Sequence, residues 1–149
     1  EKGKNVAFLT IGDASLYSTY HYILRKLKGI IPEVEVETVP GITSFAASAA
    51  LINEPLASGD EPLVVLPNVT ESLGQHLREF PNVVLMKVSR DMDRIITELK
   101  ASDKQGVFVS RCSSPQQQVV RNLDTLQGVK VDYLSLILAR EKVDTEGEG

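Results

Sequence analysis

The sequence has little of what several common functional sites require. Its 149 residues include one cysteine, two histidines and no tryptophan. Because a single cysteine excludes an internal disulfide, we expect a reducing, cytoplasmic setting. His21 and His76 have no cysteine or carboxylate partner at the spacing of a metal site, so we expect no bound metal. Cys112 with two distant histidines also makes no convincing nucleophile constellation.

Long apolar runs and basic clusters are also missing. No apolar run approaches the roughly 18–20 residues that cross a bilayer, so a membrane is not an expected partner. The formal net charge is −4, and the lysines and arginines are scattered among acidic residues. Proteins that bind nucleic acid usually carry a basic patch or stripe, so nucleic acid is not expected either. A polyanionic small molecule stays open, because a few placed arginines can serve one pocket without changing the net charge.

The sequence does contain alternating apolar runs and amphipathic stretches, which are typical of an α/β protein. Val6–Ile11 is a continuous apolar run that predicts a strand buried on both faces. Helical spacing from Leu16 to Leu27 predicts a helix, with Gly29 at its C-cap position. Residues 34–39 alternate apolar and acidic side chains, which predicts a half-exposed strand. Strand, helix and strand would form one crossover unit of a parallel sheet.

Pro40-Gly41 marks a turn and an expected domain boundary, and further elements follow it. The patterns predict helices over residues 45–51, 73–80 and 92–99, and strands over residues 63–66, 83–88, 106–110 and 134–139. Residues 115–126 fit either a helix or an extension of a strand. The acidic, glycine-rich tail over residues 142–149 is expected to be disordered.

Two motifs stand where ligands collect in α/β proteins. In the first, Gly12-Asp13 ends an apolar run, and ligands bind at the carboxyl ends of strands in open α/β sheets. Asp13 could accept hydrogen bonds from a ligand and suits a cationic one; taken alone, the residues favour a helix cap instead. In the second motif, Pro40-Gly41 leads into Thr43-Ser44 at an expected helix N-terminus. An ordinary N-cap with turn chemistry explains it equally well.

Together these motifs resemble those of the tetrapyrrole methylases. The closest resemblance is to the precorrin-2 and cobalt-factor II C20-methyltransferases. It is carried by the motif GDxSLYST, followed by VPGITSF, an alanine-rich helix and ALxxxPL, in that order. Segments 85–88, 112–116 and 132–138 fit the same subfamily, so the resemblance covers about residues 4–140. Ala14 departs from the proline that the family usually has there. The family's opening GxGPGD-type loop is absent, so we expect a piece that lacks its N-terminal part, and whether the piece alone is active stays open.

The resemblance implies the fold and the activity. Residues 1–39 would be the end of an N-terminal parallel-sheet domain, and residues 40–141 a C-terminal α/β domain with a mixed sheet. A cofactor would bind in the cleft between them. The implied reaction is methyl transfer from S-adenosylmethionine to carbon 20 of precorrin-2, or of its cobalt counterpart, in cobalamin biosynthesis, leaving S-adenosylhomocysteine. The resemblance also implies a homodimer, and the residues identify no catalytic base.

The resemblance also carries site residues over to this chain. The expected cofactor contacts are Gly12, Asp13, Thr43, Ser44, Lys87, Cys112 and Leu136. A tetrapyrrole substrate bears many carboxylates, and arginine pairs well with carboxylates. Arg111, beside the 112–115 turn, is the first candidate to bind one of them, and Lys87 is the second. The alternative is that both are surface charges without a ligand.

Two other functions stay open. One is an inert structural or dimerisation piece of such an enzyme, and the other is a related methylase of the same fold, such as a uroporphyrinogen III methylase or a diphthine synthase. The SLYST and LSLIL blocks favour the C20 enzyme.

Overall fold

The computed structural model describes residues 3–142 and divides into two compact units. The first unit comprises residues 1–44 and the second comprises residues 45–149, and each is described here by itself. The predicted disorder of residues 142–149 falls, from residue 143 onward, outside the described residues. None of the helices in the described part of the chain is both long and apolar enough to cross a membrane.

Among its described residues, the first unit contains one complete regular element, helix α1 (Tyr20–Ile30). The strands predicted over residues 6–11 and 34–39 are wrong, because neither segment pairs with another among the described residues. A strand exists only where a neighbour supplies its hydrogen bonds, and a run of apolar residues supplies none. The predicted C-cap is also wrong: Gly29 lies inside the helix, which ends when the N–H of Ile31 donates to the Leu27 carbonyl at 2.8 Å.

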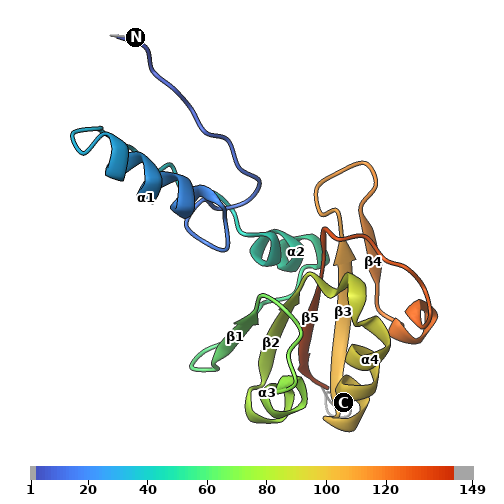
Figure 1. The fold of residues 1–149 in the computed structure, drawn as a ribbon. Coiled ribbons are helices and arrows are strands. Elements are labelled where there is room, and N and C mark those ends of the chain that lie inside the picture. Colours follow the sequence, from blue (N-terminus) through green and yellow to red (C-terminus); the bar gives the residue numbers. More distant parts are fainter. Residues whose placement is uncertain (1–2, 143–149) are drawn as a thin grey trace. The chain divides into compact units, whose positions relative to one another are not determined.

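The second unit is built on a five-stranded mixed sheet in the order β1-β2-β5-β3-β4 (Figure 1). Its strands are β1 (Leu63–Leu66), β2 (Asn82–Met86), β3 (Lys104–Ser110), β4 (Gln118–Val120) and β5 (Ser135–Glu141). β1 and β2 are parallel, whereas β5 runs antiparallel to both β2 and β3. The predicted mixed sheet is therefore confirmed, with β5 at its centre.

The helices also follow the predicted periodicity, with small shifts at their ends. They are α2 (Ser44–Ile52), α3 (Leu73–Glu79) and α4 (Met92–Ala101), with 3₁₀ turns η1 (Val88–Arg90) and η2 (Leu123–Leu126). The strand predicted over residues 83–88 stops at residue 86, because Lys87 turns the chain into η1. The ambiguous stretch 115–126 contains both a short strand, β4, and η2.

The main core lies between one face of the sheet and helices α3 and α4, which Figure 1 shows against it. It is formed by fully buried side chains including Leu77, Leu85, Ile95, Phe108 and Ile137. A Cβ at Gly106 would lie 2.9 Å from Leu123 Cδ1 and 3.0 Å from Ile137 Cγ2, so a larger residue at this position of β3 would force these core side chains to shift. The opposite face of the sheet is covered by α2, through Phe45, Leu51 and Ile52.

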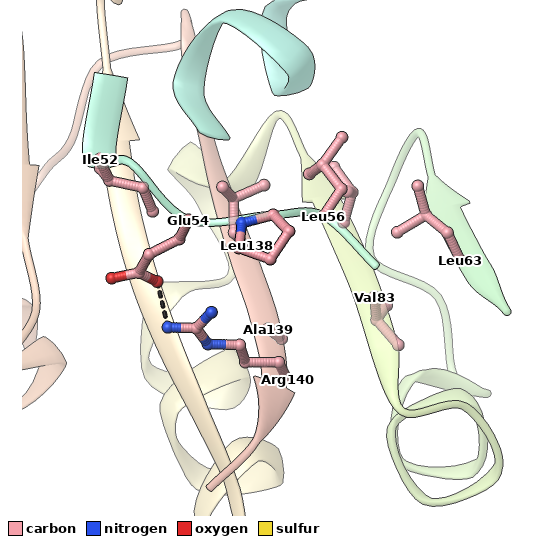
Figure 2. Close-up of a pocket in the computed structure, with 10 residues that line it drawn as sticks. Ile52, Glu54, Leu56, Leu63, Val83, Leu138, Ala139 and Arg140 are labelled. Carbon is pink, nitrogen blue, oxygen red and sulfur yellow. Dashed lines mark hydrogen bonds and ion pairs between the residues drawn. The ribbon is translucent and has the colours of Figure 1, made fainter. Parts of the chain in front are cut away.

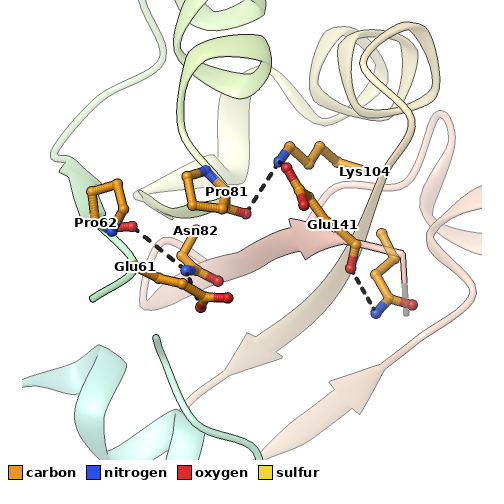
Figure 3. A network of polar contacts seen from close by, with 7 residues as sticks. Glu61, Pro62, Pro81, Asn82, Lys104 and Glu141 are labelled. Atoms are coloured by element: carbon orange, nitrogen blue, oxygen red, sulfur yellow. Dashed lines mark hydrogen bonds and ion pairs between the residues drawn. The ribbon is translucent and has the colours of Figure 1, made fainter. Parts of the chain in front are cut away.

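A polar network closes one end of the sheet, at the start of β2 and β3 (Figure 3). The Lys104 ammonium, with its side chain 3% exposed, donates to the Pro81 carbonyl at 3.2 Å and pairs with Glu141 at 3.2 Å. The Asn82 amide donates to the Glu61 carboxylate at 2.9 Å. A buried charge is tolerated only when it is paired and hydrogen-bonded, and Lys104 meets both conditions. The network therefore stabilises this end of the sheet.

Candidate functional site

The two sequence motifs of the first unit contact each other directly. The Asp13 carboxylate accepts hydrogen bonds from the Ser15 N–H at 2.7 Å and, from 28 residues away along the chain, from the Gly41 N–H at 2.8 Å. Asp13 does not cap α1, because that helix begins seven residues later, after Thr19 at the N-cap. The glycine-aspartate turn and the proline-glycine turn therefore form one assembly.

Gly41 is the position where these two turns come closest. A Cβ built on Gly41 would stand 2.2 Å from the Gly12 carbonyl oxygen and 3.3 Å from the Asp13 Cα. No side chain fits at that distance, so the contact requires glycine for reasons of space alone. Gly12 itself adopts a φ of 79°, a conformation that glycine reaches without strain.

The hydrogen bonds lower the pKa of Asp13 below its usual value. The largest cause is the Ser15 side chain, followed by the N–H groups of Gly41 and Ser15. Asp13 is therefore ionised at neutral pH and presents a negative charge beside the backbone of both turns. Because the pKa of Asp13 is lower in the folded state than in the unfolded state, this contact stabilises the fold. The stabilisation is fully present above the unfolded-state pKa and is lost as the pH falls through the folded-state pKa.

In the second unit, three chain segments meet at one edge of the sheet. The Lys87 N–H, just after β2, donates to the Ser135 carbonyl at 3.0 Å, and the Arg111 N–H, just after β3, donates to the Leu134 carbonyl at 2.9 Å. Because β5 starts where β2 and β3 end, their terminal residues share this edge. The predicted site residues Lys87, Arg111 and Leu136 are thus brought together.

The backbone at this edge is strained. Lys87 and Arg111 have φ values of 55° and 49°, and Ser113 in the following turn has a φ of 64°. For residues other than glycine such conformations cost roughly 1–3 kcal/mol each, and they cluster at functional sites. Here the hydrogen bonds that Lys87 and Arg111 donate to the Ser135 and Leu134 carbonyls hold two of them in place.

Arg111 is paired within the protein. Its Nε and a terminal nitrogen both donate to Asp132 Oδ2, at 2.9 and 2.7 Å. The other oxygen of Asp132 accepts the Leu134 N–H at 2.8 Å, and this bond, followed by the one from Arg111, lowers the pKa of Asp132. The guanidinium, with its side chain 43% exposed, keeps further donors for a ligand. Sequence reasoning missed Asp132, although this residue begins the 132–138 segment, which resembles the family.

Cys112 and Leu136 lie on the sheet face that α2 covers. Leu136 is 5% exposed and forms a small apolar cluster with Val107 and Val109, against which Cys112 and Phe45 pack. The cysteine therefore lines an apolar layer, and the residue next to Ser44 reaches the same layer. Thr43 and Ser44 stand at the start of α2, as predicted, and Ser44 is its first residue.

The predicted site residues thus form two groups, one in each unit. Gly12, Asp13, Thr43 and Ser44 belong to the first, whereas Lys87, Arg111, Cys112 and Leu136 belong to the second. Each group is assembled within its own unit. Whether they contact a cofactor stays a prediction.

The hollow in Figure 2 is a poor candidate for a ligand site. It lies between the 54–56 segment and the sheet, lined by residues such as Leu56, Val83 and Leu138, and its cavity volume is about 10 Å³, room for about one water molecule. In the described part of the chain, no three histidine, cysteine or carboxylate side chains gather as a metal site would require.

Comparison with known proteins places these features in a family. The model of the tetrapyrrole (corrin/porphyrin) methylases matches residues 1–127. The chain is 38% identical over 138 residues to a probable cobalt-precorrin-2 C(20)-methyltransferase of Methanocaldococcus jannaschii, covering 91% of this chain and 58% of the relative. It is 34% identical to the cobalt-precorrin-2 C(20)-methyltransferase of Salmonella typhimurium, covering 95% of this chain and 61% of the relative. The chain therefore spans somewhat over half the length of these curated relatives.

Solved structures agree on the fold. A cobalt precorrin-4 methyltransferase superposes with a TM-score of 0.69 at 23% identity, covering 87% of this chain and 61% of the other. A uroporphyrin-III C-methyl transferase from Thermus thermophilus, complexed with S-adenyl homocysteine, gives 0.62 at 23% identity, covering 87% of this chain and 63% of the other. With the family model covering most of the sequence, the chain belongs to the tetrapyrrole (corrin/porphyrin) methylases.

Proposed function

We propose that this chain serves in methyl transfer from S-adenosylmethionine to carbon 20 of precorrin-2, or of its cobalt-containing counterpart, in cobalamin biosynthesis. One observation carries the proposal: relatives named for this reaction match more than nine-tenths of the chain at 33–38% identity. The SLYST and LSLIL blocks that favoured the subfamily lie within the chain. The alternative of a related methylase has weaker support, because structures of other methylases resemble the chain only at 23% identity or below.

The residues of the first unit fit a cationic cofactor. Asp13 is ionised at neutral pH, and its carboxylate has acceptor capacity beyond the bonds it receives from Ser15 and Gly41. S-adenosylmethionine, when bound, supplies a methyl group activated on a sulfonium. In this proposal Asp13 and the backbone of Gly12 hold the cofactor, with Thr43 and Ser44 at the start of α2.

The residues of the second unit fit the remaining tasks. The buried layer of Leu136, with Cys112 packed against it, keeps water from this side of the sheet, whereas Lys87 and Arg111 at the neighbouring sheet edge offer positive charge for substrate carboxylates. Alignment and dehydration favour the methyl transfer itself, whose reactivity resides in the cofactor. The proton that carbon 20 loses on methylation passes to a base that the residues of these two groups do not identify.

The cofactor assignment is tested by calorimetry with S-adenosylhomocysteine on the protein as its gene encodes it. Asp13→Ala removes the carboxylate and the contact to Gly41, so we expect affinity to fall about tenfold or more. Asp60→Ala, which removes an exposed carboxylate of the second unit, is the matched control and should bind normally. An unmodified protein that does not bind S-adenosylhomocysteine would refute the proposed function.

The substrate assignment is tested by Arg111→Met. We expect the Michaelis constant for the tetrapyrrole to rise about tenfold or more, because a charge-assisted pair is lost, while cofactor affinity changes little. Arg78→Met, on the exposed side of α3, is the control. Unchanged substrate kinetics in the Arg111 variant would leave that residue as a surface charge paired to Asp132.

The remaining expectations belong to the same proposal. A homodimer is implied by the resemblance, and a cytoplasmic setting by the lone cysteine. Light scattering tests the first. An inert structural or dimerisation role stays the alternative prediction. Mass spectrometry of the product after incubation with precorrin-2 distinguishes it from the enzyme.

A further inference from the structure

Helix α2 is held on the sheet by few contacts. Of its nine residues only Ser48 and Ala49 are buried, and both have small side chains. The Ser48 hydroxyl has no hydrogen-bond partner among residues 3–142. Apolar packing comes from Phe45 at one end and from Leu51 and Ile52 at the other. Small side chains bury little area, so something further has to fix the position of this helix.

That further contact is an ionic network at the C-terminal end of α2. The Glu54 N–H donates to the Ala49 carbonyl at 3.1 Å, which makes Glu54 part of the helix end. Its carboxylate, with the side chain 18% exposed, pairs through one oxygen with Arg140 on β5 and through the other with Arg121 after β4, the latter at 2.6 Å. Figure 2 shows the Glu54 and Arg140 side chains pointing toward each other.

The network differs from an ordinary surface pair. Arg140 is 27% exposed and Glu54 is 18% exposed, so both charges are partly withdrawn from solvent. The Lys100–Asp124 pair on the other side of the sheet has side chains 60% and 52% exposed. Exposed pairs contribute little to stability, whereas breaking a buried pair leaves a charge without compensation.

We infer that Glu54 is a positioning residue, which locks α2 onto β5 and thereby sets where Phe45, in the first turn of α2, packs on the Leu136 and Cys112 layer. The same strand carries both Arg140 and Leu136, so a carboxylate bound to the first fixes the helix relative to the second. The inference rests on the proposed function only for its ligand measurement. The anchoring itself is a property of the fold.

Glu54→Gln tests the anchoring, because glutamine keeps the size but removes the charge and turns an amide donor toward an arginine donor. Hydrogen exchange should become about tenfold faster for the amides of residues 48–52, which lie beyond the first turn of α2, with residues 96–100 of α4 unchanged. Arg140→Gln should act similarly and Arg121→Gln less, since Arg121 is 59% exposed. Asp124→Asn, in the exposed pair, is the matched control. Unchanged exchange in α2 of the Glu54 variant would overturn the inference.

Ligand binding separates positioning from general destabilisation. Glu54→Gln should weaken S-adenosylhomocysteine binding about threefold to tenfold, because misplaced groups lose binding and rate together. Ile96→Val, in the core on the opposite face, lowers stability without touching α2 and should bind normally. Normal binding by both variants would overturn the positioning role. If the unmodified protein does not bind, the proposed function fails, and the exchange measurement alone decides whether Glu54 anchors α2.

Discussion

Gly41→Ala is expected to lower the methyl-transfer rate by about 10²-fold, the loss that a displacement of roughly 1 Å can cause. The added Cβ would stand 2.2 Å from the Gly12 carbonyl oxygen, so the two turns have to separate. Their separation breaks the hydrogen bond from Gly41 to Asp13. Because both turns carry proposed cofactor contacts, cofactor affinity should fall together with the rate. Calorimetry with S-adenosylhomocysteine and a methylation assay measure the two effects.

The control for this variant is the same substitution in the same unit. A Cβ at Gly29, within α1, meets nothing within 4 Å, and alanine is the better helix former. Gly29→Ala should therefore leave activity unchanged. If Gly41→Ala were as active as Gly29→Ala, close approach of the two turns would not matter for the reaction, and the cofactor assignment of this assembly would be wrong.

Phe108→Ala is expected to destabilise the second unit by about 3–5 kcal/mol. Phe108 is 1% exposed and lies on β3, packed into the main core. Its removal loses apolar burial and leaves a cavity that its neighbours in the close-packed core cannot fully close. Domains are stable by roughly 5–15 kcal/mol, so the loss is a large fraction of the total. Urea unfolding followed by far-ultraviolet circular dichroism measures it.

Phe8→Ala is the matched control, because this phenylalanine is 48% exposed and its main aromatic neighbour is Tyr20, with ring centroids 6.3 Å apart. It should change the unfolding of the second unit by less than about 0.5 kcal/mol. Equal losses from the two substitutions would contradict the core placement of β3.

Local pattern was sufficient for most of the longer elements of the second unit. The stripe of Met92, Ile95, Ile96 and Leu99 predicts α4, and all four are buried. The apolar run over residues 134–139 predicts a strand, and β5 forms there, paired with β2 and β3. These predictions succeed because spacing along the chain and the side facing the core are linked by the geometry of the helix and the strand.

The same reasoning failed where a partner was needed. Val6–Ile11 has the composition of a buried strand, yet it forms no strand, and Val6 is 93% exposed. Apolar side chains indicate that a segment can be buried, but hydrogen bonds from a neighbour decide whether it is a strand. The end of β2 shows the same limit, since Lys87 leaves the strand where its N–H meets the Ser135 carbonyl.

The sequence by itself determined the α/β class, the positions of most helices and strands, and the motifs that mark the family. Only the tertiary structure decided which distant residues meet: Asp13 with Gly41, 28 residues apart, Arg111 with Asp132, 21 apart, and Glu54 with Arg140, 86 apart. Periodicity reports which side of an element faces a core, because it depends on neighbouring residues alone. Contacts between distant residues depend on strand order and register, which no local pattern specifies.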